Sequence, residues 1–173
     1  MLTKDQMLRY LKQIADRLGE QGLCGEILLT GGAAMCLVHG ARDMTKNIDA
    51  LYEPKDVINS IARDIAEQEK LPENWLNDGV KGFVEQNATL ESFMSFGSLR
   101  IQTVSAEYLL AMKMMSARYG EKDREDILFL FNKLDIKTIE TATNVLLKFY
   151  PLNRILPKTQ YVIEEIVECL SQS

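Results

Sequence analysis

The segment from residue 26 to residue 54 constrains the fold of this chain most, because two short apolar runs enclose a glycine pair and a helix-forming stretch. The first run leads into Gly31-Gly32, and the second contains Asn47 and Asp49. Residues two apart in a β-strand project from the same face, so the side chains of Asn47 and Asp49 should point together. The segment predicts a strand, a short helix and a second strand, with polar groups gathered beside a glycine turn.

Apolar periodicity along the rest of the chain predicts more helices than strands. Thr3 and Gln6 have the spacing of a capping box at the start of the first helix, and Ser105 can cap a later helix. Residues 71–87 show neither the apolar period of a helix nor the alternation of a strand, and we expect a structured loop with a short helical turn there. The predicted helices cover 3–19, 32–39, 55–69, 106–118, 121–134, 137–149 and 159–171, and the predicted strands cover 26–30, 47–52, 88–96 and 99–104.

This order of elements predicts the α+β class, with a small mixed β-sheet flanked by helices and a helical C-terminal part. We expect residues 1–104 to form the sheet-containing core and residues 105–173 to pack on that core as helices. The length of 173 residues allows a single domain or a core domain with a helical appendage.

Charge and residue counts argue against several classes of function. The net charge of −5 gives no general reason to expect nucleic-acid binding, which normally shows as a basic surplus; a local basic patch is still compatible with it. His39 is the only histidine, which removes zinc-hydrolase sites built from several imidazoles. The three cysteines have no metal-ligand spacing and indicate reduced thiols. We expect a cytoplasmic protein without a signal peptide or a membrane-spanning stretch.

Gly31-Gly32 and Asp49 together suggest a metal–triphosphate site. A glycine pair that enters a helix offers free backbone N–H groups to a phosphate, and a neighbouring acid can hold Mg²⁺ on the other side of that phosphate. Alone, the glycine pair is more typical of a simple turn, since it lacks the lysine–serine ending of a P-loop. With Asn47 and Asp49 following at this distance, the nucleotide site becomes the better interpretation.

Basic residues that precede the second strand could meet the same triphosphate. Arg42 is suited to bidentate phosphate recognition, and Thr45 and Lys46 stand next to each other shortly after it. A solvated turn accounts for Arg42 equally well and for Lys46 better.

Lys113 lies inside an otherwise apolar stretch of a predicted helix. Such a lysine can extend to water along its aliphatic stem, or it can be held inward as a phosphate ligand. Asp123 and Asp126 follow one loop later and share a helix face, being three residues apart. Acids at the start of a helix are favourable beside its N-terminal dipole, which accounts for Asp123 well and for Asp126 less well.

These features resemble a known superfamily. The pattern of two glycines, a helix, Arg, Thr and then acid–hydrophobic–acid resembles the nucleotidyltransferase superfamily, whose strand carboxylates bind Mg²⁺–NTP. Four segments narrow the resemblance to a bacterial family of minimal nucleotidyltransferases related to the AbiEii and MenT type toxins, and the likeness covers nearly the whole chain. The segments are TKNIDALYEP (45–54), LPENWLNDGVKGF (71–83), SAEYLLAMKMMSAR (105–118) and KDREDILFL (122–130).

The resemblance implies roles for individual residues. Mg²⁺ would be held by Asp49 and the residue at position 47, and Asp123 or Asp126 would shape the site or help to deprotonate the acceptor. Asn77 would lie near the pocket without an assigned role. The residues implied in nucleotide binding are Gly31, Gly32, Arg42, Thr45, Asp78, Lys81 and Lys113. Those implied in catalysis are Asn47, Asp49, Lys113, Asp123 and Asp126.

Asn47 is the departure from the family pattern, which has Asp at this position. An amide oxygen can bind Mg²⁺ but brings no charge, and hard cations favour carboxylate ligands, so both metal binding and transfer should be weakened. We therefore expect a Mg²⁺-dependent nucleotidyltransferase that moves NMP from an NTP to a hydroxyl of RNA or protein, with reduced or lost activity. The alternative is a non-catalytic nucleotide-binding module, such as one partner of a toxin–antitoxin pair.

Overall fold

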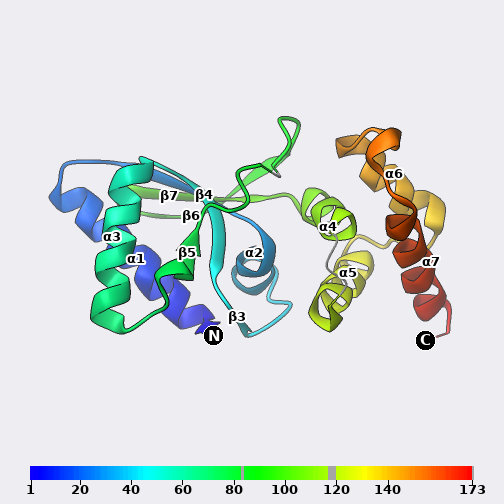
Figure 1. Cartoon of the computed structure of the whole chain (residues 1–173), viewed down its shortest axis with the longest axis horizontal. Coiled ribbons are helices and arrows are strands. Elements are labelled where there is room, and N and C mark those ends of the chain that lie inside the picture. Colours follow the sequence, from blue (N-terminus) through cyan, green and yellow to red (C-terminus); the bar gives the residue numbers. More distant parts are fainter. Residues whose placement is uncertain (83, 117–119, 173) are drawn as a thin grey trace. The chain divides into compact units, whose positions relative to one another are not determined.

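The computed structural model describes residues 1–82, 84–116 and 120–172, and the chain forms two compact units (Figure 1). The first unit comprises Met1–Val84 and Leu90–Val104, and the second comprises Glu85–Thr89 and Ser105–Ser173. The division into two domains after residue 104 stays a prediction, because compactness alone does not show independent folding. No helix within the described ranges is long and apolar enough to cross a membrane.

The first unit contains all the strands that the structure describes, with three α-helices. Its elements are β1 (Leu2–Thr3), α1 (Lys4–Glu20), β2 (Gly25–Leu29), α2 (Gly31–Leu37), β3 (Met44–Thr45), β4 (Ile48–Glu53), α3 (Lys55–Glu69), the 3₁₀ turn η1 (Glu73–Trp75), β5 (Leu76–Asn77), β6 (Leu90–Phe96) and β7 (Leu99–Val104). The main sheet has the strand order β5-β4-β2-β7-β6, and β1 pairs with β3 in a separate two-stranded sheet. Strand β2 is antiparallel to β4 and parallel to β7, and β4 is parallel to β5. The predicted α+β class with a small mixed sheet is confirmed.

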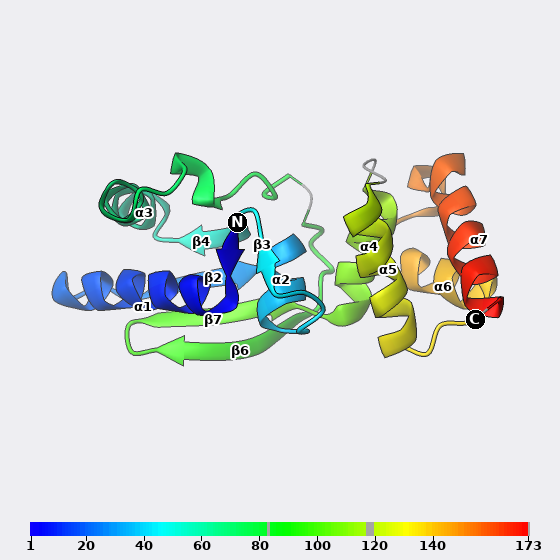
Figure 2. The ribbon, with the colours of Figure 1, turned by 90° about the horizontal axis from the view of Figure 1, so that it is seen from below.

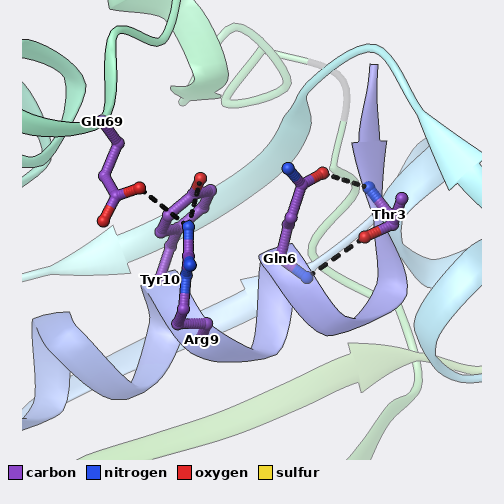
Figure 3. A network of polar contacts seen from close by, with 5 residues as sticks. All are labelled: Thr3, Gln6, Arg9, Tyr10 and Glu69. Atoms are coloured by element: carbon purple, nitrogen blue, oxygen red, sulfur yellow. Dashed lines mark hydrogen bonds and ion pairs between the residues drawn. The ribbon is translucent and has the colours of Figure 1, made fainter.

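Helix α1 begins where its sequence predicts. The Thr3 side chain accepts a hydrogen bond from the Gln6 backbone N–H, and the Gln6 side chain accepts one from the Thr3 backbone N–H, so the predicted capping box is present (Figure 3). Two turns later, Arg9 forms an ion pair of 2.7 Å with Glu69 at the end of α3 and donates a 3.0 Å hydrogen bond to the Tyr10 hydroxyl (Figure 3). The Arg9–Glu69 ion pair joins α1 to α3, and the two helices are neighbours in the structure (Figure 2).

The main sheet has one buried face and one open face. Because side chains alternate along a strand, one set packs against the helices and forms the core, namely Ile27, Leu29, Ile48, Ala50, Tyr52, Leu99 and Ile101. The alternate set is half-buried or exposed, namely Glu26, Leu28, Asp49, Leu51, Glu53, Arg100 and Gln102. The strand that carries Asp49 therefore turns this carboxylate away from the core.

Residues 71–87 differ from the prediction of a loop with a helical turn. The turn is present as η1, but a two-residue strand, β5, follows it and pairs with β4. Trp75 is fully buried and its Nε1–H donates to the Ala62 carbonyl at 2.9 Å. The buried Trp75 holds the chain beside the edge of the sheet. Strand β5 has only two residues, which is too short for apolar alternation to be recognised in the sequence. The two-residue strands β1 and β3 were missed for the same reason.

The second unit is helical, with α4 (Ala106–Met115), α5 (Glu121–Lys133), α6 (Ile139–Phe149), the 3₁₀ turn η2 (Leu152–Arg154) and α7 (Pro157–Ser171). Ser105 caps α4 by accepting a hydrogen bond from the Tyr108 backbone N–H, as predicted. Helix α4 ends at Met115 with Ser116 as its C-cap, earlier than the predicted end at residue 118, which lies outside the described residues. Tyr108 packs edge-on against Phe149 of α6, with ring centroids 4.9 Å apart, so α4 forms the centre of the unit's core.

Candidate functional site

Asp49 on β4 is the centre of a polar cluster on the open face of the sheet. Its Oδ1 accepts hydrogen bonds from the side-chain amides of Asn47 at 3.0 Å and Asn77 at 2.9 Å. The prediction that Asn47 and Asp49 point together is confirmed. Asn77 reaches Asp49 because β5 is parallel to β4 with these two residues in register. The cluster therefore contains one carboxylate and two amides.

Thr30 fixes the backbone of Asp49. Its backbone N–H and its hydroxyl both donate to the Asp49 carbonyl, each at 3.0 Å, and its side chain is fully buried. Thr30 is also the residue before the glycine pair, so it joins the end of β2 to β4 at the point where the chain turns into α2. The sequence marks this residue only as a polar group at the end of an apolar run.

The glycine pair makes room for the side chains of the neighbouring strand. Gly31 has a φ of +53°, a conformation that favours glycine, and a Cβ there would lie 3.3 Å from Asp49 Oδ2. A Cβ on Gly32 would lie 2.5 Å from Thr45 Oγ1 and 3.7 Å from an Arg42 guanidinium nitrogen. The structure thus brings five predicted site residues together around one turn, with Asn47 beside them.

Asp78 and Lys81 lie on the loop after β5 and show different contacts. Asp78 forms an ion pair with Lys55 at the start of α3, and the hydrogen bond between them lowers the pKa of the Asp78 carboxyl and raises the pKa of the Lys55 ammonium. Lys81 is exposed, and its backbone N–H closes a turn to the Asp78 carbonyl at 3.0 Å. In the structure, Asp78 therefore anchors the loop to α3.

Lys113, Asp123 and Asp126 form a cluster of their own in the second unit. The Lys113 ammonium lies 2.7 Å from Asp123 Oδ1 and 2.7 Å from Asp126 Oδ2. The side chains of Lys113 and Asp126 are 12% and 5% exposed, and that of Asp123 is 25% exposed. Of the two placements considered for Lys113, the inward one is observed, and its ammonium contacts the two carboxylates on α5.

The donor set around Asp49 is compatible with Mg²⁺ that arrives with a nucleotide. The described residues contain no group of three or more carboxylate, histidine or cysteine side chains that could hold a metal ion by themselves. Mg²⁺ in such sites is usually bound by one or two carboxylates together with substrate phosphates, rather than by a complete protein cage. None of the described residues donates to Asp49 Oδ2, so this oxygen can serve as the carboxylate ligand.

A mixed sheet flanked by helices, with a glycine turn beside a strand carboxylate, is consistent with a nucleotidyltransferase fold. The comparison with protein families agrees: the family described as "Nucleotidyltransferase of unknown function (DUF6036)" matches residues 6–153. The chain therefore belongs to this family of nucleotidyltransferases. Searches among the curated proteins and among the solved structures gave no match. The predicted superfamily is confirmed, and the relation to AbiEii and MenT type toxins stays a prediction.

Proposed function

We propose that this protein is a Mg²⁺-dependent nucleotidyltransferase that moves NMP from an NTP to a hydroxyl of RNA or protein, weakened by the amide at position 47. The observation that supports this most is the placement of Asp49. Its carboxylate lies on the open face of the sheet, with Oδ2 directed at the backbone of Gly31. Family membership adds the reaction class.

Each part of this cluster has a chemical task in the proposal. Asp49 Oδ2 and position 47 would hold Mg²⁺, which neutralises charge on the phosphates during in-line attack at the α-phosphorus. The turn at Gly31-Gly32 lets a phosphate approach the backbone closely, and Arg42 supplies a nearby guanidinium. The Thr45 hydroxyl lies beside Gly32, where a Cβ would come within 2.5 Å of it, and Thr45 stays a proposed nucleotide contact. Asp78 and Lys81 stay proposed nucleotide contacts at the edge of this site.

Asn47 limits the reaction in this proposal. Its amide donates to Asp49 Oδ1, so it must rotate to offer its oxygen to a cation. After rotation it still brings no charge, whereas a carboxylate would bring one. Asn47→Asp should therefore increase both Mg²⁺–NTP affinity and transfer.

The test is transfer of label from each of the four α-³²P-labelled NTPs to cell RNA and protein, with Mg²⁺. The parent chain, Asn47→Asp and the control Asn74→Asp are compared; Asn74 is exposed on η1, so the control makes the same chemical change away from the cluster. Label should rise only in Asn47→Asp and disappear when Asp49→Asn is added. If Asn47→Asp neither binds Mg²⁺–NTP nor labels any acceptor, the enzyme proposal fails.

A second candidate is a non-catalytic nucleotide-binding module, which could act as one partner of a toxin–antitoxin pair of the AbiEii or MenT kind. The two amide donors on Asp49 favour it, because they engage one of the two carboxylate oxygens, Oδ1, without a cation. Calorimetry with NTP in the presence and absence of Mg²⁺ separates the candidates. Binding that does not need Mg²⁺, without turnover, supports the module.

Lys113, Asp123 and Asp126 stay proposed contributors to phosphate contact and to deprotonation of the acceptor. The Lys113 ammonium contacts both carboxylates. A ligand that binds Lys113 must therefore either add to these two contacts or replace one of them. Origin in bacteria stays a prediction of the same resemblance, and a cytoplasmic location stays a prediction from the cysteine pattern and the apolar segments of the sequence.

A further inference from the structure

We infer that Asn77 is a positioning residue for Asp49: it holds the carboxylate so that one oxygen is engaged by the protein and the other is presented to the cation–nucleotide. This inference rests on the proposed function, because a presented oxygen matters only if a ligand uses it. The sequence offered no role for Asn77. The role follows from three features of the structure, which are the register of β5, the orientation of the Asn77 amide and the anchoring of its loop.

The register of β5 places Asn77 directly beside Asp49. Strands β4 and β5 are parallel, and Ile48 is paired with Leu76 and Asp49 with Asn77. Adjacent residues of paired strands present their side chains on the same face. The Asn77 Nδ2 to Asp49 Oδ1 distance of 2.9 Å is that of a hydrogen bond to a charged acceptor.

The orientation of the Asn77 amide is fixed by a second hydrogen bond. The Gly79 backbone N–H donates to Asn77 Oδ1 at 3.1 Å. A side-chain amide has one acceptor oxygen and one donor nitrogen, and its orientation must be inferred from its partners. Because a backbone N–H can only donate, Oδ1 must face Gly79 and Nδ2 must face Asp49. Among the described residues, the Asn47 side chain makes only the bond to Asp49, so no second hydrogen bond fixes the orientation of its amide.

The loop that carries Asn77 is anchored on both sides. Before it, Trp75 is fully buried and bonded to the Ala62 carbonyl at 2.9 Å. After it, Asp78 is paired with Lys55 at the start of α3. The backbone at position 77 is therefore already ordered, so little further conformational entropy is lost when the Asn77 amide binds Asp49.

The result is a carboxylate with two different oxygens. Oδ1 receives two N–H donors, whereas Oδ2 lies beside Gly31, where a Cβ would come within 3.3 Å of it. Groups that hydrogen-bond a metal-binding side chain orient it, and replacing them typically costs about 10- to 100-fold in metal affinity or activity. We expect Asn77 to contribute a factor of about 10 to 100 to nucleotide affinity. This effect should come from its N–H donor to Asp49 and not from the turn that its Oδ1 closes with the Gly79 N–H.

Two substitutions separate the N–H from the turn. Asn77→Ala removes both contacts, whereas Asn77→Asp keeps an oxygen for the Gly79 N–H but removes the donor to Asp49. The affinity of the chain for each of the four NTPs is measured by calorimetry with Mg²⁺. Both substitutions should weaken binding about 10- to 100-fold, while Asn74→Ala and Asn74→Asp leave it unchanged. Parent-like affinity in Asn77→Ala would overturn the inference, because this variant lacks the donor to Asp49 and, unlike Asn77→Asp, adds no charge that could compensate for it.

A measurement without nucleotide tests the contact directly. In the ¹⁵N-labelled chain, one Asn77 side-chain N–H should shift downfield because it donates to a carboxylate, and the shift should disappear in Asp49→Ala. The Asn74 amide provides the reference signal. An Asn77 amide that is insensitive to Asp49→Ala overturns the inference even if nucleotide binds. If neither the parent chain nor Asn47→Asp binds any NTP but the amide signal responds, the proposed function fails and the Asn77–Asp49 contact stands.

Discussion

Replacing Lys113 by methionine should destabilise the chain because it removes the ammonium shared by two carboxylates. In the structure, Asp123 Oδ1 and Asp126 Oδ2 each lie 2.7 Å from the Lys113 nitrogen. Methionine preserves most of the apolar stem, so the change in packing is small. The variant therefore removes the ammonium that lies 2.7 Å from each of these two carboxylates on α5.

Burial decides the magnitude of this effect. Exposed ion pairs contribute about 0.2–1 kcal/mol, whereas removing one partner of a buried pair costs about 3–5 kcal/mol. The side chains of Lys113 and Asp126 are 12% and 5% exposed, but that of Asp123 is 25% exposed and partly solvated. We therefore expect a loss of about 3 kcal/mol in the free energy of unfolding, at the lower end of the buried range.

Urea unfolding followed by far-ultraviolet circular dichroism measures this loss. Lys148→Met is the matched control, because Lys148 pairs with Glu107 in the same unit and both side chains are about half exposed, at 52% and 41%. The control should lose at most about 1 kcal/mol, and Lys113→Met combined with Asp126→Asn should recover much of the loss. Equal losses in Lys113→Met and Lys148→Met would refute the reasoning from burial.

Two further predictions concern the first unit. Gly32→Ala should cost about 1–3 kcal/mol and weaken nucleotide binding, because its Cβ would lie 2.5 Å from Thr45 Oγ1. Gly22→Ala, at a φ of +68° with open space around it, should cost about 1 kcal/mol and leave nucleotide affinity at the parent value. If calorimetry gives Gly32→Ala the same nucleotide affinity as Gly22→Ala, the role of the Gly32 contact is contradicted. Burial raises the pKa of Tyr52 from 10.0 to about 12, so its contribution to stability is present below pH 10 and is lost as the pH rises toward 12. Tyr52→Phe should flatten the fall of Tm over this interval without abolishing it, because burial also raises the pKa of Tyr150; an unchanged slope would show that Tyr52 is not the group responsible.

Elements with a long period or a defined terminus could be predicted from the sequence. Helix α1 combines an apolar stripe with the Thr3–Gln6 capping box, and both signals agree on where the helix begins. The hairpin of β6 and β7 turns at Gly97, which has a φ of +49°. In both cases a local interaction fixes the element, so the local sequence carries the information.

Strand β5 could not be predicted in this way, and with it the contact of Asn77 was missed. Two residues are too few to show a period of alternating apolar and polar side chains, so a two-residue strand leaves no recognisable pattern in the sequence. Its position depends instead on Trp75, whose burial against α3 is a tertiary contact. The single tryptophan within an irregular segment was the available signal, since a buried anchor of this size fixes the chain on both sides of it.

The Lys113 cluster shows why a correct placement does not settle a role. Asp123 and Asp126 each lie 2.7 Å from the Lys113 ammonium, so a triphosphate would have to compete with two negative charges for this lysine. The ammonium has three N–H donors, and two of them are directed at Asp123 and Asp126. Between the two predicted roles, this competition favours acids that act on an acceptor hydroxyl over a lysine that binds phosphate. The variant Lys113→Met/Asp126→Asn carries the same net charge without the ammonium, so nucleotide affinity that stays unchanged in it would support the acceptor role.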